Sequence, residues 1–360
     1  MSVAPVAGQE QAQTQLRAWL QAERMPHAIL LSGPAGSGKR RLALTLVAAL
    51  NCEAGGATAC GACVSCRQTM ALQHPNIQVL LPLMRKGRKD EAQIQDDLRL
   101  AAAEYIQHGF SLAQANANIP RDYIRLVQRE MAFPPTQNKR KIGLIFEAEC
   151  MHPAGANALL KILEEPPSYV VFVLVSSHPE RILPTIRSRC QRLNLKRLSR
   201  NGLQEQLQQR GFSGEHLTVA TRLGDGSMEQ ALATGEDGFD ERRHQVERFL
   251  LAGLKGEDGV YAELLETLEV RQDRGRLEGF IGLSMSYLRD LFLLEHGCQD
   301  AVTHVDRIEI LRQLEALMVP GQLERATEEM DQAFARIGQN VNAQLVLADV
   351  WRLLRRALAQ

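Results

Sequence analysis

The sequence predicts an α/β domain built on a parallel sheet, followed by a part of the chain that contains only helices. Between about residues 25 and 195, short apolar runs alternate with helical patterns, as in a parallel sheet covered by helices on both faces. Thirteen of the fourteen prolines lie at or before Pro184, so the C-terminal half contains few residues that break helices. A length of 360 residues indicates two or three domains.

Five apolar runs are the candidate strands of the sheet: residues 27–32, 77–81, 142–146, 170–176 and 190–195. Pro120 and Pro153 each open a segment with apolar residues at helical spacing, which predicts two helices that cover the sheet. Residues 85–118 begin with a cluster of Lys and Arg and continue as a polar, alanine-rich stretch. We expect a solvated loop and one exposed helix there, in preference to an arm that binds nucleic acid.

The C-terminal half shows helical spacing of apolar residues in five segments: 241–254, 275–295, 305–318, 322–337 and 342–358. A smaller helical segment, at roughly residues 197–237, precedes these five and is marked by glycines near residues 225 and 237. We therefore predict three domains, at residues 1–196, 197–238 and 239–360.

The charge balance bears on the class of partner. With 42 basic and 42 acidic side chains, the chain has no overall field that attracts a polyanion, which argues against a stand-alone DNA-binding protein. The N-terminus lacks a basic segment followed by an apolar run, and the apolar stretch at residues 27–31 is too short to cross a bilayer. We expect a cytoplasmic protein that does not contact a membrane.

A phosphate-binding loop follows the first candidate strand. Its residues Gly33, Gly36, Gly38 and Lys39 have the spacing at which backbone N–H groups surround phosphate oxygens and a lysine reaches the terminal phosphates. The strand, loop and helix pattern strengthens this interpretation. A glycine-rich turn without a ligand is the alternative, and the number of matching positions disfavours it.

The groups that would hold magnesium at this loop are missing. Arg40 stands where a Ser or Thr hydroxyl normally binds the ion. A second contact normally comes from an acid at the end of a later strand, but Phe146 occupies that position and Glu147 follows it. Without a positioned metal, the charge that develops on the phosphates is not neutralised. We expect ATP hydrolysis to be severely impaired, while ATP or ADP binding remains possible but weak or absent.

Four cysteines, Cys52, Cys60, Cys63 and Cys66, have the spacing of a structural zinc site with four thiolate ligands. A redox switch fits less well, because four ligands leave no open position on the metal. His74 lies nearby and is expected to be a structural side chain.

Three later segments carry a resemblance to a known family: residues 157–167 (NALLKILEEPP), 173–177 (VLVSS) and 183–190 (LPTIRSRC). Their order and spacing resemble the clamp-loader subunits of bacterial DNA polymerase III, which are AAA+ proteins. The resemblance extends to about residue 240. It implies a RecA-like AAA+ domain with an inserted zinc module at residues 52–66, a helical lid, and a helical collar for oligomerisation.

The resemblance also implies roles for single residues. Arg189 corresponds to the arginine finger that enters the ATP site of a neighbouring subunit, which suits a planar, charged group; a surface salt bridge is the alternative. Ser176 and Ser177 match the sensor-one position, where a hydroxyl contacts a phosphate or caps a turn. Residues 226–232 match the sensor-two signature, with Glu229 in place of its arginine.

Together these residues imply a subunit that does not hydrolyse ATP but completes a neighbour's site, in a complex of gamma/tau and delta subunits that loads the sliding clamp onto primed DNA. One alternative is an active gamma/tau-like ATPase. It would need a hydroxyl at position 40, an acid at position 146 and an arginine at position 229, and the chain lacks all three. Another is a zinc-dependent nucleic-acid-binding module. For that module, residues 52–75 offer a single basic residue, Arg67, and no aromatic one.

Overall fold

The computed structural model describes residues 6–83, 91–108, 117–136, 139–267, 274–319, 321–338 and 343–355. By its internal contacts the chain divides into two compact units. The first contains the described residues up to 202 together with 226–228, and the second contains 203–225 and the described residues from 229 onward. The separation of a lid from a collar remains a prediction.

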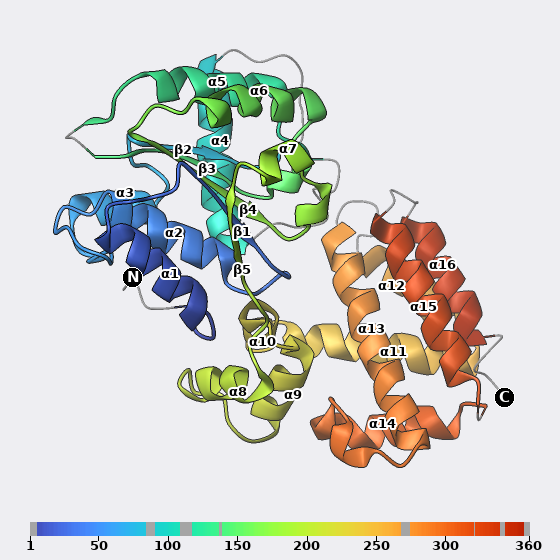
Figure 1. The fold of residues 1–360 in the computed structure, drawn as a ribbon. Coiled ribbons are helices and arrows are strands. Elements are labelled where there is room, and N and C mark those ends of the chain that lie inside the picture. The colour runs from blue at the N-terminus through green and yellow to red at the C-terminus, as the bar shows by residue number, and fades with distance from the viewer. Residues whose placement is uncertain are drawn as a thin grey trace. The chain divides into compact units, whose positions relative to one another are not determined.

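The first unit is built on a five-stranded sheet with the strand order β2-β3-β4-β1-β5 (Figure 1). The pairings between neighbouring strands are all parallel. The strands are β1 (Ala28–Ser32), β2 (Ile77–Leu80), β3 (Lys141–Ile145), β4 (Val170–Ser176) and β5 (Gln191–Asn194). The parallel sheet that the apolar runs predicted is therefore confirmed, and each run overlaps one strand.

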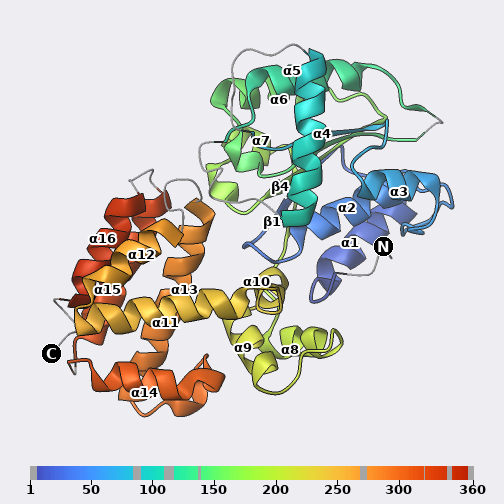
Figure 2. The same cartoon turned by 180° about the vertical axis from the view of Figure 1, so that it is seen from behind.

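Helices cover both faces of the sheet, as predicted (Figures 1 and 2). Ile29 and Leu31 of β1 belong to the apolar core that includes residues of α1 and α2, whereas Leu30 belongs to the core that includes residues of α5 and α6. This alternation explains why β1 is buried throughout and is apolar from Ala28 to Leu31. The helices of this unit are α1 (Glu10–Gln21), α2 (Lys39–Leu50), α3 (Val64–Met70), α4 (Glu91–His108), α5 (Arg121–Ala132), α6 (Pro153–Glu164) and α7 (Pro184–Arg187), with short 3-10 helices at Ala148–Cys150 and Pro179–Arg181.

Helix α4 differs from the exposed helix expected in residues 85–118. Four of its residues at helical spacing are buried: Ile94, Leu98, Ala102 and Tyr105. Ile94 and Leu98 join one core of the sheet, and Ala102 and Tyr105 join the other. The expectation was wrong because the buried face is narrow and contains alanine, which hides it in a polar sequence. The basic cluster at the start of the segment lies outside the described residues.

The second unit contains only helical elements in its described residues, as expected. All five segments with helical spacing overlap a helix, and α12 was not predicted. The helices from residue 200 onward are α8 (Arg200–Gln208), α9 (Gly214–Gly224), α10 (Met228–Ala233), α11 (Phe239–Lys255), α12 (Asp258–Thr267), α13 (Arg274–Glu295), α14 (Ile308–Ala316), α15 (Leu323–Gly338) and α16 (Ala343–Leu353), with 3-10 helices at Gln299–Ala301 and Val305–Arg307. None of the described helices is long and apolar enough to span a bilayer.

Candidate functional site

The phosphate loop joins β1 to α2 at the carboxyl end of the sheet, where ligands bind in open α/β sheets. Gly33, Gly36 and Gly38 have positive φ angles of 149°, 72° and 86°. A Cβ atom at Gly33 would clash with the Leu195 carbonyl oxygen, and one at Gly36 would clash with the Ser227 side chain. The glycines are therefore required by both backbone conformation and close packing.

Lys39 begins α2 and is buried, with 6% of its surface exposed. Its Nζ donates a hydrogen bond of 2.7 Å to the Pro34 carbonyl oxygen, within the loop itself. The Ser37 hydroxyl is buried and has no hydrogen-bond partner among the described residues. Gln9 Nε2 donates to the carbonyl oxygens of Ser37 and Lys196, at 3.2 and 2.7 Å, and so ties the loop to the chain after β5.

The two positions where magnesium ligands would be expected face one aromatic ring. The Arg40 guanidinium lies 5.1 Å from the Tyr105 ring centroid, and its Nη1 donates to the Tyr105 carbonyl oxygen at 3.3 Å. The ring of Phe146, which is buried, lies 4.8 Å from the same ring. We call Arg40, Tyr105, Phe146 and Glu147 the aromatic cluster. The sequence reasoning missed Tyr105, and the helical spacing of buried residues in α4 was the signal that could have found it.

Glu147 is the fourth member of the aromatic cluster. Its Oε1 accepts a hydrogen bond of 2.6 Å from the Tyr105 hydroxyl. Burial raises the pKa of Glu147, an effect that the Tyr105 hydrogen bond and the charges of Lys39 and Arg40 oppose. The carboxylate therefore already has a partner within the protein.

Ser176 lies at the carboxyl end of β4, in register with Ser32, the last residue before the phosphate loop. Its Oγ is fully buried and accepts a hydrogen bond from the His178 N–H at 3.1 Å. The N–H of Ser177 donates to Glu149 Oε1 at 3.0 Å. Ser176 thus caps the turn after β4, one of the two roles considered for it.

Residues 226–232, which match the sensor-two signature, are divided between the two units. Ser227 packs against Gly36 of the phosphate loop, within the first unit. Glu229 lies in α10 and belongs to the second unit.

Arg189 lies between α7 and β5, with 36% of its side chain exposed. Its Nη2 donates to Glu164 Oε1 at 2.8 Å, and its Nη1 donates to the Thr185 carbonyl oxygen at 3.0 Å. Glu164 is the last residue of α6 and is 52% exposed. Within the chain, Arg189 therefore forms a surface ion pair with a residue of the NALLKILEEPP segment.

The structure brings the four predicted cysteines together (residues 52, 60, 63 and 66). Their sulfur atoms all lie within 4.8 Å of one another, and those of Cys60 and Cys66 are 4.0 Å apart. Zn–S bonds of about 2.3 Å in a tetrahedron place sulfur atoms about 3.8 Å apart, so the arrangement fits zinc. The backbone N–H of Cys63 contributes most to lowering the pKa of Cys60 to about 6, which favours the thiolate form.

His74 is not a fifth ligand in this arrangement. Its Nδ1 accepts a hydrogen bond from the Asn76 N–H at 3.1 Å, and its Nε2 lies 3.0 Å from Ser65 Oγ. Burial lowers the pKa of His74. Both ring nitrogens are engaged, so the expectation of a structural side chain is confirmed.

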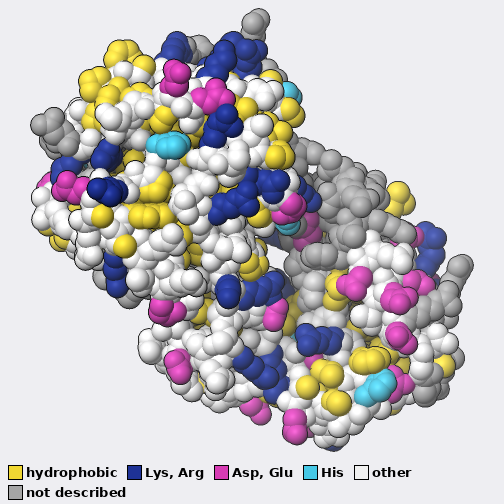
Figure 3. Space-filling model, viewed as in Figure 1, with side chains coloured by type: hydrophobic (Ala, Val, Ile, Leu, Met, Phe, Trp, Pro, Cys, Tyr) yellow, Lys and Arg dark blue, Asp and Glu magenta, His cyan; other side chains and the backbone are white. Residues whose placement is uncertain are grey.

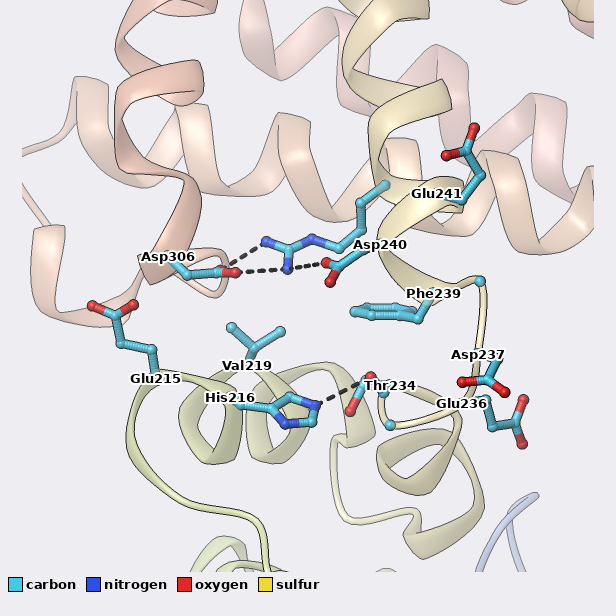
Figure 4. A pocket seen from close by; sticks show the side chains of 13 residues that line it. Glu215, His216, Val219, Thr234, Glu236, Asp237, Phe239, Asp240, Glu241 and Asp306 are labelled. Carbon is cyan, nitrogen blue, oxygen red and sulfur yellow. Dashed lines mark hydrogen bonds and ion pairs between the residues drawn. The ribbon is translucent and has the colours of Figure 1, made fainter.

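A pocket of about 600 Å³ lies in the second unit, beside the start of α11 (Figure 4). Six carboxylates line it, from Glu215, Glu236, Asp237, Asp240, Glu241 and Asp306. The Arg243 guanidinium donates to both oxygens of Asp306, each at 2.7 Å. Because the carboxylates outnumber the basic side chain, the pocket does not suit the phosphates of a nucleotide.

Comparison with known proteins gives a consistent result. The model of a family described as DNA polymerase III, delta subunit, matches residues 8–199. The DNA polymerase III subunit delta-prime of Bacillus subtilis is 24% identical over 327 residues, which cover 90% of this chain and 89% of the relative. The tau subunit of Salmonella typhimurium is 31% identical over 261 residues, which cover 70% of this chain and 35% of the relative.

The first tau and gamma/tau relatives are much longer than the part that matches, which spans between 27% and 38% of their length. Among solved structures, a DNA polymerase III gamma subunit-related protein of Thermotoga maritima is 16% identical, with a TM-score of 0.47 over 95% of this chain and 99% of that one. The family match covers more than half of the chain, including the phosphate loop, the four cysteines and Arg189. The chain therefore belongs to the DNA polymerase III delta-subunit family of clamp-loader proteins, in which it resembles delta-prime.

Proposed function

We propose that this clamp-loader subunit does not hydrolyse ATP itself, and that it completes the ATP site of a neighbouring subunit with Arg189. The observation that carries the proposal is the aromatic cluster. Arg40 and Phe146 stand where the magnesium ligands belong, and both pack against Tyr105.

The chemistry of hydrolysis supports the first half of the proposal. Magnesium neutralises the charge that develops on the transferred phosphate, and neither a guanidinium nor a phenyl ring provides an oxygen ligand for it. Glu147 has a carboxylate, but it accepts the Tyr105 hydroxyl hydrogen bond. ATP or ADP binding to Gly33, Gly36, Gly38 and Lys39 is accordingly weak or absent, because Lys39 bonds to the loop's own carbonyl.

The environment of Arg189 supports the second half. Exposed ion pairs contribute only about 0–1 kcal/mol, so exchanging Glu164 for a phosphate costs little. A guanidinium is planar and always charged, and it can bridge two phosphate oxygens. Arg189 is thus suited to act on a phosphate outside its own chain.

The partners follow from the family. We assign this subunit to a complex with gamma/tau and delta subunits that loads the sliding clamp onto primed DNA during replication in the cytoplasm. On the face shown in Figure 3, Lys and Arg side chains are scattered among acidic and uncharged ones. Such a surface suits a subunit that reaches DNA through an assembled complex better than one that binds DNA alone.

The cysteine cluster is proposed to hold one structural zinc ion. Four thiolates would close its coordination sphere, so the ion would stabilise residues 52–66 and leave no position for a reacting molecule. Cys52 follows α2 directly, and Cys63 caps α3, so the ion would link the two helices.

An active gamma/tau-like ATPase is the second candidate, because the chain is 31% identical to the tau subunit of Salmonella typhimurium and 24% identical to the delta-prime subunit of Bacillus subtilis. The two candidates differ in a direct assay of the isolated protein. We expect no ATP turnover above background with magnesium, under conditions in which a purified gamma/tau subunit turns over. Magnesium-dependent turnover that disappears in a Lys39→Ala variant would establish the ATPase instead.

A further inference from the structure

The aromatic cluster does more than lack two magnesium ligands. A third side chain, that of Tyr105, lies against the side chains at both ligand positions. Tyr105 lies in α4, whereas Arg40 lies in the first turn of α2 and Phe146 directly follows β3. No motif of the sequence includes Tyr105. It contacts the side chains at both ligand positions, and its hydroxyl holds the neighbouring acid.

We propose that Tyr105 excludes the divalent cation from this phosphate loop, so that restoring the two ligand side chains does not by itself restore a metal site. A magnesium ion shared by positions 40 and 146 would lie about 2.1 Å from an oxygen at each. The Tyr105 ring lies against both side chains, with its centroid 5.1 Å from the Arg40 guanidinium and 4.8 Å from the Phe146 ring. The inference rests on the proposed loss of hydrolysis and names the residue that enforces it.

The position of the Tyr105 ring is fixed by the rest of α4. Tyr105 is 3% exposed, and Ile94, Leu98 and Ala102 bury the same face of the helix in the cores of the sheet. In the unmodified chain the hydrogen bond of the Tyr105 hydroxyl to Glu147 and the cation–π contact with Arg40 also hold the ring, whereas the packing of α4 remains when Arg40 is replaced. We therefore expect a nucleotide that binds in the loop to bind there without magnesium.

The test compares the effect of magnesium on ADP binding in a series of full-length variants. ADP affinity is measured by calorimetry with and without added MgCl₂, and without a chelator, so that the cysteine cluster is not disturbed. In the wild-type chain and in the Arg40→Thr/Phe146→Asp pair, we expect magnesium to leave the affinity unchanged. Adding Tyr105→Ala to that pair is expected to make magnesium tighten ADP binding at least tenfold.

Two further variants isolate the ring as the cause. Tyr105→Phe in the same background keeps the ring and loses the bond to Glu147, so it is expected to show no response to magnesium. Tyr105→Leu keeps an apolar side chain for packing of α4, and is expected to respond as Tyr105→Ala does, which keeps the test open if the alanine variant does not fold. Leu100→Ala, at a position 73% exposed on the same helix, is the control that should not respond.

The proposal is overturned if the Arg40→Thr/Phe146→Asp pair already responds to magnesium, if Tyr105→Phe responds, or if neither Tyr105→Ala nor Tyr105→Leu makes the pair respond. These outcomes differ from a failure of the proposed function, which would appear as ATP turnover by the unmodified chain.

Discussion

Arg40 removes a magnesium ligand from the phosphate loop, and its guanidinium packs against another residue of the same unit. Arg40 is half-buried, and it lies over Tyr105 and donates to that residue's carbonyl oxygen. The sequence shows that an oxygen ligand is missing, but not what replaces it, since Arg40 and Tyr105 are 65 residues apart. The loss of a ligand was therefore predictable from one position, and the aromatic cluster was not.

The same limit applies to Arg189. Its motif indicates its type of role, but its pairing with Glu164 depends on how α6 ends beside the turn before β5. For Ser176 the sequence went further, because the turn cap that its hydroxyl forms was one of its two predicted roles.

His304 is a buried titratable residue in the second unit. It is fully buried and stacks on Tyr287, with ring centroids 4.0 Å apart, and its Nε2 lies 2.8 Å from Ser286 Oγ. Burial, with a further contribution from Arg243, lowers the pKa of His304 from its usual 6.5 to about 3. The folded unit therefore holds this imidazole neutral.

This burial predicts a specific loss of stability in acid. Because the folded pKa lies below the unfolded one, the contribution is complete above about pH 6.5 and falls as the pH drops toward 3. At pH 4.5 the loss is about 2–3 kcal/mol relative to pH 7. Urea unfolding in a Trp19→Phe background, followed by Trp351 fluorescence, measures it.

The matched control is His304→Gln, which keeps a polar group and does not titrate. Other groups, including Asp290, whose pKa burial raises, contribute equally to both proteins. Equal pH dependence in the two proteins would show that His304 does not titrate as described.

Among the elements, the sheet was the most predictable part of the fold. Strands that are buried on both faces form nearly continuous apolar runs, as β1 and β4 do before their final serines, and this signal does not depend on distant residues. Helix α4 was the least predictable element, because its burial depends on an alanine and on residues spaced along a polar segment. The order of the strands was not predicted, since it is set by crossover connections between distant parts of the chain.

The segment that contains the four cysteines, residues 52–66, is expected to bind zinc and to depend on it for local stability. Protein purified without a chelator should contain about one zinc per chain. Removing the metal should increase amide hydrogen exchange in residues 52–66 and at the start of α3 more than in β1 and β4, because the ligands link only this stretch. Elemental analysis and hydrogen exchange followed by mass spectrometry are the measurements.

Cysteine variants provide the control for this prediction. Cys63→Ser should lower the zinc content and reproduce the local loosening, whereas Cys298→Ser, an exposed cysteine outside the cluster, should do neither. Metal-free wild-type protein from such a preparation would contradict the assignment.

For the whole molecule, the predicted order of an α/β unit followed by helices agrees with the structure, and the family match agrees with the motifs that indicated it. The charge balance of 42 basic and 42 acidic residues is consistent with action inside a complex. We propose accordingly that two chains act together: this chain does not hydrolyse ATP, and its Arg189 assists a neighbour that does.

The most direct test of that claim is the ATPase rate of a reconstituted complex with gamma/tau and delta subunits, measured with sliding clamp and primed DNA. We expect Arg189→Ala to leave assembly intact and to suppress hydrolysis at one neighbouring site. Arginine fingers contribute roughly 10³–10⁵ in rate, and the total falls by less because other sites keep their own fingers. Arg189→Lys should restore little activity, because an ammonium lacks the planar pair of donors.

Glu164→Ala is the decisive control, since it removes the same ion pair and keeps the guanidinium. We expect the Glu164→Ala complex to hydrolyse ATP at nearly the wild-type rate, and the Arg189→Ala complex to be slowed. Equal rates for wild-type and Arg189→Ala complexes that assemble equally, or equal losses in both variants, would contradict the proposal.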